Sequence, residues 1–92
     1  MFTLSAKLTF YIPHAMSLKD KRLVCRSLLD KTRQKFNVSA AEVGTQDMRQ
    51  TLTIGVSLVS GEYAHARQSM DAVIRYLEGN CDAELANVEE WG

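Results

Sequence analysis

The residues best suited to chemistry are a serine and a group of cations in the first half of the chain. Ser17 is followed three residues later by Asp20, a spacing typical of the cap that opens a helix. A helix start with free N–H groups, a hydroxyl and nearby cations suits a phosphate group. We therefore predict an anion-binding site, for a nucleotide or an RNA backbone, made by Ser17, Lys19, Lys21, Arg22, Arg26 and Arg33.

The crowding of cations at this helix start has two interpretations. Lys19, Lys21 and Arg22 oppose the positive end of the helix dipole, and such a departure from a local rule marks a candidate functional site. The alternative is that Asp20, Asp47 or carboxylates near the end of the chain pair with these cations. Surface charges are also commonly just solvated, and exposed pairs contribute only about 0–1 kcal/mol. Both interpretations stay open from the residues alone.

His14 lies just before this helix and is a candidate loop contact, as a proton carrier or a base-stacking ring. No carboxylate or cysteine stands at a ligand or triad spacing from it, so a surface histidine is the simpler interpretation. Cys25 and Cys81 show no metal-binding spacing, and we expect both to be free thiols. The chain has no P-loop, dinucleotide fingerprint or nucleophile elbow. We therefore expect a protein that is not an enzyme and needs neither metal nor cofactor.

The helix that positions these cations is expected to begin at Leu18. Lys19, Arg22, Arg26 and Arg33 project within roughly 60° of one another on its surface, beside an apolar stripe that faces the core. Residues 18–36 carry seven Lys and Arg against two Asp, a net charge of +5, although the whole chain is neutral. The zero net charge argues against non-specific binding along nucleic acid or a membrane surface, whereas a localised basic patch still attracts an anionic partner.

The order of apolar patterns predicts the fold. Residues 2–12 and 51–59 alternate as strands covered on one side, and residues 38–43 form a short strand before a polar turn. The second helix is amphipathic and ends at Gly79-Asn80, and its core stripe is expected to be Tyr63, Ala66, Met70, Val73, Ile74 and Leu77. Residues 83–91 form a strand with a bulge or an edge position. Residues 1–92 thus make one α+β domain, a ferredoxin-like sandwich (βαββαβ) with a four-stranded antiparallel sheet and two helices on one face.

Three stretches resemble the YlxP-like family of small bacterial proteins of unknown function. They are residues 12–22 (Ile-Pro-His-Ala-Met-Ser-Leu-Lys-Asp-Lys-Arg), residues 36–43 and Gln46-Asp47. The resemblance spans essentially the whole chain and implies a ferredoxin-like fold. Genes of this family often lie among genes for translation initiation and ribosome maturation, but no activity follows from the resemblance. Relatives tend to have Trp where this chain has Met48, which weakens any aromatic contact at that turn.

Two functions from different classes follow. The first is an accessory RNA-binding or ribosome-associated module that holds phosphates with the basic helix. The second is a protein-interaction or regulatory domain, homodimeric through the sheet face or an edge strand, whose basic helix meets an acidic partner. Stacking of RNA bases on the sheet is not expected, because the outward residues of residues 51–57 are small. The start of the chain lacks a signal-peptide pattern and no run is long enough to span a membrane, so we expect a cytoplasmic protein.

Overall fold

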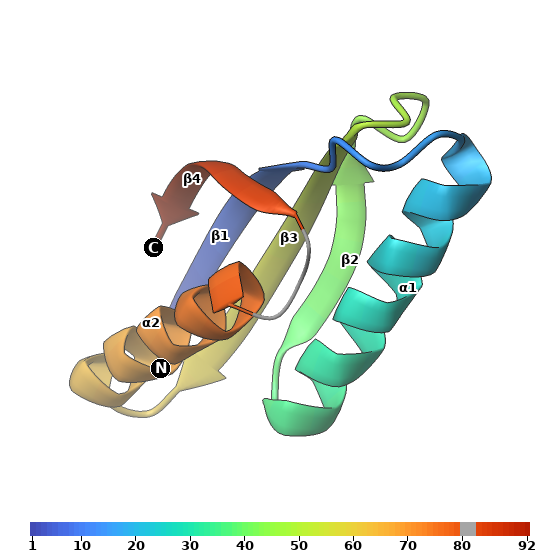
Figure 1. Ribbon diagram of the computed structural model, residues 1–92. Helices are drawn as coiled ribbons and strands as arrows, with labels where there is room; N and C mark the ends of the chain where they lie inside the picture. The colour runs from blue at the N-terminus through green and yellow to red at the C-terminus, as the bar shows by residue number, and fades with distance from the viewer. Residues whose placement is uncertain (80–82) are drawn as a thin grey trace.

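The computed structural model describes residues 1–79 and 83–92, and its six elements follow the predicted order (Figure 1). They are β1 (Phe2–Tyr11), α1 (Leu18–Lys35), β2 (Ser39–Gly44), β3 (Thr51–Ser60), α2 (Tyr63–Gly79) and β4 (Glu84–Trp91). The predicted ferredoxin-like α+β fold is confirmed. The predicted C-cap residue Asn80 and the thiol of Cys81 lie outside the described residues.

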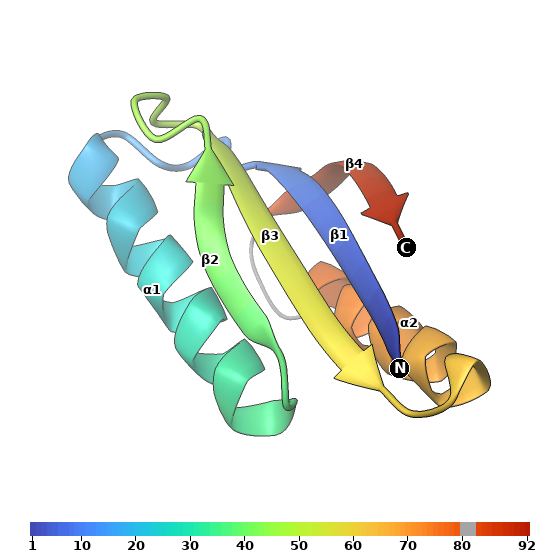
Figure 2. The same cartoon turned by 180° about the vertical axis from the view of Figure 1, so that it is seen from behind.

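The four strands form one antiparallel sheet in the order β2-β3-β1-β4. β1 and β3 pair along their whole length, from Phe2 opposite Ser60 to Tyr11 opposite Thr51. α1 packs against β2, α2 packs against β1 and β3, and no helix of the described residues covers the other face of the sheet (Figure 2). This topology brings the end of β1, the start of α1 and the β2–β3 turn to one end of the molecule.

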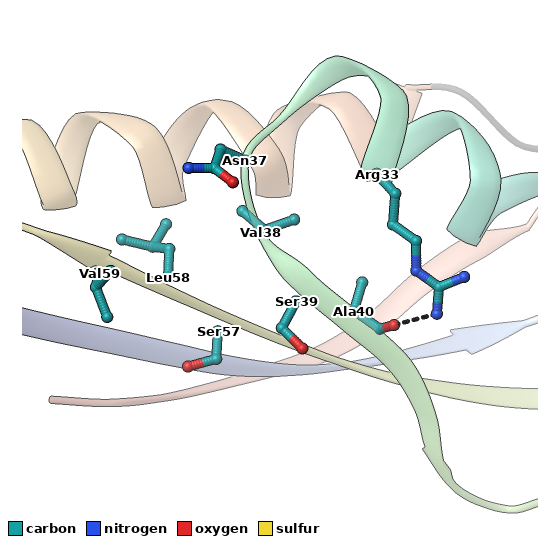
Figure 3. A pocket seen from close by; sticks show the side chains of 8 residues that line it. All are labelled: Arg33, Asn37, Val38, Ser39, Ala40, Ser57, Leu58 and Val59. Atoms are coloured by element: carbon teal, nitrogen blue, oxygen red, sulfur yellow. Dashed lines mark hydrogen bonds between the residues drawn. The ribbon is translucent and has the colours of Figure 1, made fainter.

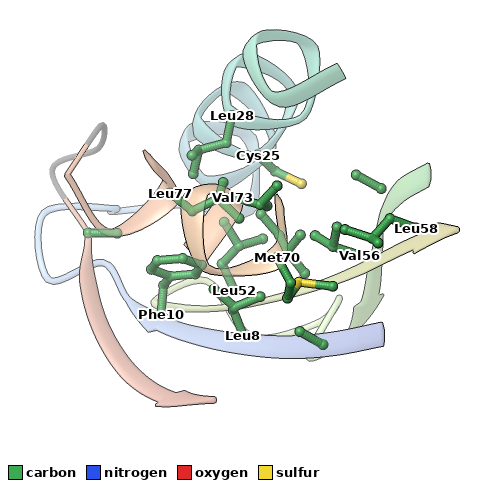
Figure 4. Packing of buried hydrophobic residues seen from close by; sticks show 14 of the residues in the cluster. Leu8, Phe10, Cys25, Leu28, Leu52, Val56, Leu58, Met70, Val73 and Leu77 are labelled. Carbon is green, nitrogen blue, oxygen red and sulfur yellow. The ribbon is translucent and has the colours of Figure 1, made fainter. Parts of the chain in front are cut away.

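Alternation along the strands builds the core, because every second side chain of β1 and β3 points toward the helices. Leu8, Phe10 and Leu52 are fully buried there, facing Met70 and Leu77 of α2 (Figure 4). The prediction that Tyr63 belongs to this core stripe is wrong. Its ring is 51% exposed and packs edge-to-face on Phe2, with 5.8 Å between the ring centroids.

The irregular strand β4 contains the predicted bulge. Thr9 pairs with Asn87 and Phe10 pairs with Leu85, so Ala86 is an extra residue without an opposite partner. A bulge of this type lets residues that are out of phase reach the same face, and both Leu85 and Val88 pack against the core.

We predict that deleting Ala86 costs about 1 kcal/mol or less of unfolding free energy. Removing the extra residue leaves Asn87 opposite Thr9 and Leu85 opposite Phe10, on their present faces. Deletion of Val88 is the matched control. It shifts the following residues to the opposite face and removes an apolar contact, so we expect a loss of about 2 kcal/mol or more. Urea unfolding measures both, and equal losses would contradict the assignment of Ala86 as the bulge.

Candidate functional site

The first turn of α1 is closed by its own side chains. The Ser17 hydroxyl accepts a hydrogen bond from the N–H of Asp20 at 3.1 Å, as predicted for a cap. The Asp20 carboxylate reaches one residue further out than the usual capping box and accepts from the N–H of Met16 at 3.0 Å. Ser17 is therefore engaged in the cap, and a carboxylate already lies at the helix terminus where an anion was expected.

Lys21 does not lie on the exposed basic surface, which corrects the prediction made for it. Its side chain is 1% exposed, and its ammonium donates to the backbone oxygens of Thr45 at 2.6 Å and Gln46 at 3.2 Å. It also donates to the oxygen of Thr51 at 3.3 Å and lies 3.3 Å from a carboxylate oxygen of Glu42. The physical reason is helical spacing, because Lys21 stands one turn before the buried Cys25 on the inward stripe. This lysine fastens α1 to the β2–β3 turn.

The turn that Lys21 holds has an unusual backbone. Thr45 has a φ of 53°, in the left-handed region that β-branched residues rarely adopt. Its hydroxyl donates to the oxygens of Gly44 and Thr51 and lies 2.9 Å from the hydroxyl of Thr53. The ammonium of Lys21 binds the carbonyl of the same residue. Side-chain hydrogen bonds thus compensate for a strained conformation that fixes the shape of the turn.

Three of the predicted cations remain on the exposed surface of α1, and we call Lys19, Arg22 and Arg26 the basic strip. All three are exposed and, within the described part of the chain, their side chains have no hydrogen bond or ion pair. Leu23, 57% exposed, lies beside them on the next flank of the helix. Three free cations on one helical face are available to bind an anionic partner without first breaking an internal contact.

Arg33 is set apart from the basic strip by its contacts. Its guanidinium donates to the backbone oxygen of Ala40 on β2 (Figure 3). It also lies 4.0 Å from the carboxylate of Asp30. Ala40 belongs to an edge strand, and a guanidinium bound to an edge carbonyl hinders pairing with another strand. Arg33 also lines a hollow of about 590 Å³ at the start of β2, together with Asn37 and Val59.

The loop that contains His14 lies beside the β2–β3 turn, although the two segments are far apart in the sequence. The side chain of Gln50 donates to the oxygen of Pro13 at 3.0 Å, and Ile12 donates to the oxygen of Gln50 at 2.8 Å. These bonds tie the loop before α1 to the end of the turn, where Arg49 is exposed. Arg49 was not among the residues predicted from the sequence, although the predicted topology already placed its turn at the same end as the start of α1.

The open face of the sheet has a shallow hollow of about 340 Å³ over Gly55. Val43 leans across this glycine, and a Cβ added to Gly55 would lie 2.8 Å from its side chain. Trp91, opposite Ser5 in register, lines the same hollow and is 52% exposed. The outward side of β3 is small as predicted, but the neighbouring strands add an aromatic and an aliphatic side chain that the sequence analysis did not place there.

Cys25 lies near the same charged residues as Lys21, but its thiol is expected to be unreactive. It is a free thiol, 6% exposed, on the inward face of α1. Burial, and then the carboxylate of Glu42, raise the pKa of this thiol, while Lys21 and Arg33 act in the opposite direction. The thiolate form needed for nucleophilic chemistry is therefore disfavoured in the folded protein.

We expect Cys25 to react with a thiol reagent at least about 100-fold more slowly in the folded protein than in the urea-unfolded chain. The measurement uses a Cys81→Ser variant at pH 8, so that one thiol is followed. Because the pKa is raised by folding, the contribution of this thiol to stability is intact below the pKa of the unfolded chain. That contribution is lost as the pH rises through the pKa of the folded protein. Equal rates in both states would contradict the buried placement.

Among residues 1–79 and 83–92, no group of three or more His, Cys, Asp and Glu is placed to hold a metal ion. In the same described part of the chain, neither helix combines the length and the apolar character needed to cross a membrane.

The family model for "Protein of unknown function (DUF503)" matches residues 3–90. The chain is also 34% identical over 64 residues to "Uncharacterized protein YlxP" of Bacillus subtilis (strain 168), which covers 70% of each protein. Among solved structures, the designed protein Ferredog-Diesel is 13% identical with a TM-score of 0.43, over 96% of this chain and 84% of that one. The predicted family is confirmed, and the chain belongs to the YlxP-like DUF503 family of uncharacterised proteins.

Proposed function

We propose that this protein is an accessory RNA-binding or ribosome-associated module that holds phosphates with the basic strip. The observation that carries the proposal is that Lys19, Arg22 and Arg26 share one exposed face of α1 and have no side-chain partner in the described part of the chain. Cations of this kind position a protein on a phosphate backbone without reading sequence. The translation genes that often surround members of the family support an RNA partner and a cytoplasmic site of action.

The contact surface in this proposal is the flank of α1 rather than its terminus. Asp20 lies at the terminus and would repel a phosphate there, whereas the basic strip runs along the side of the helix. Arg49 and His14 extend the surface at the end where the β2–β3 turn meets the loop before α1. The role proposed for the protein is binding, with no catalytic step and no cofactor.

Binding to purified ribosomal subunits and to short structured RNA, measured at two salt concentrations, tests this function. Three phosphate contacts give a slope of log affinity against log salt of about −2.7 on duplex nucleic acid and about −2.1 on single strands. Affinity that falls with salt at about this slope supports the proposal. The proposal is overturned if neither RNA nor subunits bind at the lower salt concentration.

A second candidate function is a homodimeric interaction domain that pairs through the open face of the sheet. The hollow over Gly55, flanked by Val43 and Trp91, favours it, because exposed apolar side chains commonly mark an interface. The four strands lie about 4.8 Å apart and, at about 3.3 Å per residue, extend for roughly 27 Å, so the face has an area of roughly 500 Å². A dimer would therefore bury about 1,000 Å² in total. That area is at the lower limit of specific interfaces and predicts a weak dimer.

For this second function we predict that the protein dimerises only at high concentration and that Ser57→Lys makes it monomeric. Ser57 lies at the centre of the open face, where lysines from two copies would meet and repel. Thr53→Lys is a poorer test, because Thr53 is 4% exposed and its substitution would disturb the turn. Light scattering during gel filtration measures the mass, with exposed Glu78→Lys on α2 as the control. A monomeric wild type at every concentration would exclude the dimer.

A further inference from the structure

We propose that a separate cleft, between the last turn of α1 and the first turns of α2, binds a small organic carboxylate. The cleft has a volume of about 230 Å³ and lies over the end of β3. Phe36, Leu58 and Val73 form an apolar wall, and Lys35, His65 and Ser69 line it with polar groups. Such a combination suits a ligand with an apolar body and one charged end.

Lys35 supplies the positive charge of this cleft. Its ammonium lies 5.4 Å from the ring centroid of Tyr76 and 5.9 Å from that of Phe36. The two rings pack edge-to-face with their centroids 5.5 Å apart, so the cation rests on a fixed aromatic pair. Lys35 forms no ion pair with any carboxylate of the described chain. A ligand carboxylate would therefore meet a positioned cation that is not already neutralised.

The opposite side of the cleft adds donors from α2. His65 and Ser69 stand four residues apart, so they lie on the same helical face. His65 belongs to the first turn of α2, where the positive dipole end favours an anion. Among residues 1–79 and 83–92, no Asp or Glu lines the cleft. One cation from α1 and two neutral donors from α2 thus line the cleft, without a carboxylate among its described lining residues.

The size and lining of the cleft restrict the ligand. Its volume is below the range of roughly 300–1,000 Å³ that is typical for drug-sized ligands, so the ligand is a compact acid such as an aromatic or branched aliphatic carboxylate. Inorganic phosphate would leave the apolar wall of Phe36, Leu58 and Val73 without a partner. The cleft is also distinct from the basic strip, since Lys19 and Lys35 are about 24 Å apart along α1.

A titration followed by ¹H–¹⁵N NMR tests the proposal, with benzoate as the probe and benzamide as its uncharged match. We expect saturable shifts at residues 35–38, 58–59, His65 and Ser69, and at least about fivefold weaker binding of benzamide. Lys35→Met should weaken benzoate binding by at least about fivefold, while Lys31→Met, an exposed lysine of the same helix, should not. Ser69→Leu should block the cleft and remove the shifts, and the spectrum itself reports whether each variant is folded.

Three results would overturn the proposal. One is the absence of saturable shifts in the cleft with benzoate in the millimolar range. Another is equal affinity for benzoate and benzamide, which would leave an apolar hollow without anion recognition. The third is benzoate binding that Lys35→Met leaves unchanged.

Discussion

The Lys21→Met variant is expected to lose about 3 kcal/mol of unfolding free energy, a large effect for a single lysine. Methionine keeps an apolar stem of similar length but removes an ammonium that contacts three backbone oxygens and the carboxylate of Glu42. The oxygens of Thr45 and Gln46 then lose this donor, the oxygen of Thr51 keeps only the Thr45 hydroxyl, and Glu42 becomes an unpaired, mostly buried charge. For a domain of this size, the loss should lower the melting temperature by roughly 12–24 °C.

Urea unfolding of Lys21→Met and Lys31→Met separates the effect of losing a buried lysine from the effect of losing one positive charge. Lys31 is exposed on the same helix, and its substitution should change the unfolding free energy by no more than about 0.5 kcal/mol. Glu42→Gln should cost less than Lys21→Met, because the three backbone oxygens still bind the ammonium. A loss below about 1 kcal/mol for Lys21→Met would contradict the buried placement of this lysine.

The same variant should loosen the β2–β3 turn selectively. Thr45 holds a left-handed backbone that Lys21 stabilises through the carbonyl of that residue. Without the ammonium, the strained conformation loses one of its constraints, so amide hydrogen exchange should accelerate at residues 44–50 more than in the centre of β1 and β3. Uniform acceleration along the chain would instead indicate global destabilisation alone.

The fold was predictable because its strongest signals are local. Alternation along residues 2–12 and 51–59 determines which side of each strand faces the helices, and Ser17 marks the start of α1 at Leu18. Even the irregular last strand was predictable. Leu85 and Val88 reach the core together only if β4 has an extra residue between the two that pair with Thr9 and Phe10. Tyr63 was misplaced because position on a helical wheel does not show where the neighbouring layer ends.

The site was less predictable because its residues differ by tertiary contact rather than by type. Lys21 and Arg22 are adjacent cations, yet one is buried under a hairpin turn and the other is exposed. A lysine on an apolar stripe normally extends its charge to water, and only the proximity of the backbone oxygens of residues 45, 46 and 51 reverses this. The stretch that carries the family resemblance thus includes a helix cap and a buried lysine whose role in this chain is structural.

The open face of the sheet likewise depends on contacts between segments that are distant in the sequence. Gly55 and Ser57 correctly predicted a face of small residues on β3, but the hollow exists because Val43 and Trp91 flank it from other strands. The position of Trp91 depends on the register of β4 after its bulge, which places it opposite Ser5. The alternation along one strand therefore does not predict which side chains from other strands will lie next to it.

An Arg22→Glu, Arg26→Glu double variant is expected to bind RNA or ribosomal subunits about 100-fold more weakly than the wild type, while its fold is unchanged. Both residues are exposed and have no partner among residues 1–79 and 83–92, so their substitution breaks no internal contact. Each lost charge-assisted contact to phosphate weakens binding by about tenfold. The salt slope should also fall by about 2, because two fewer phosphates are neutralised.

The control that gives this result meaning is a Lys31→Glu, Arg75→Glu double variant. It changes the net charge of the protein by the same amount at two exposed positions outside the basic strip. If binding depends on a localised surface, this control should lose only a few-fold in affinity and keep the wild-type salt slope. If both variants lose affinity equally, the attraction comes from overall charge, and the basic strip is a solvated helix face. A loss confined to Arg22 and Arg26 would instead place the phosphate contacts on the flank of α1, away from the carboxylate of Asp20 that closes its terminus.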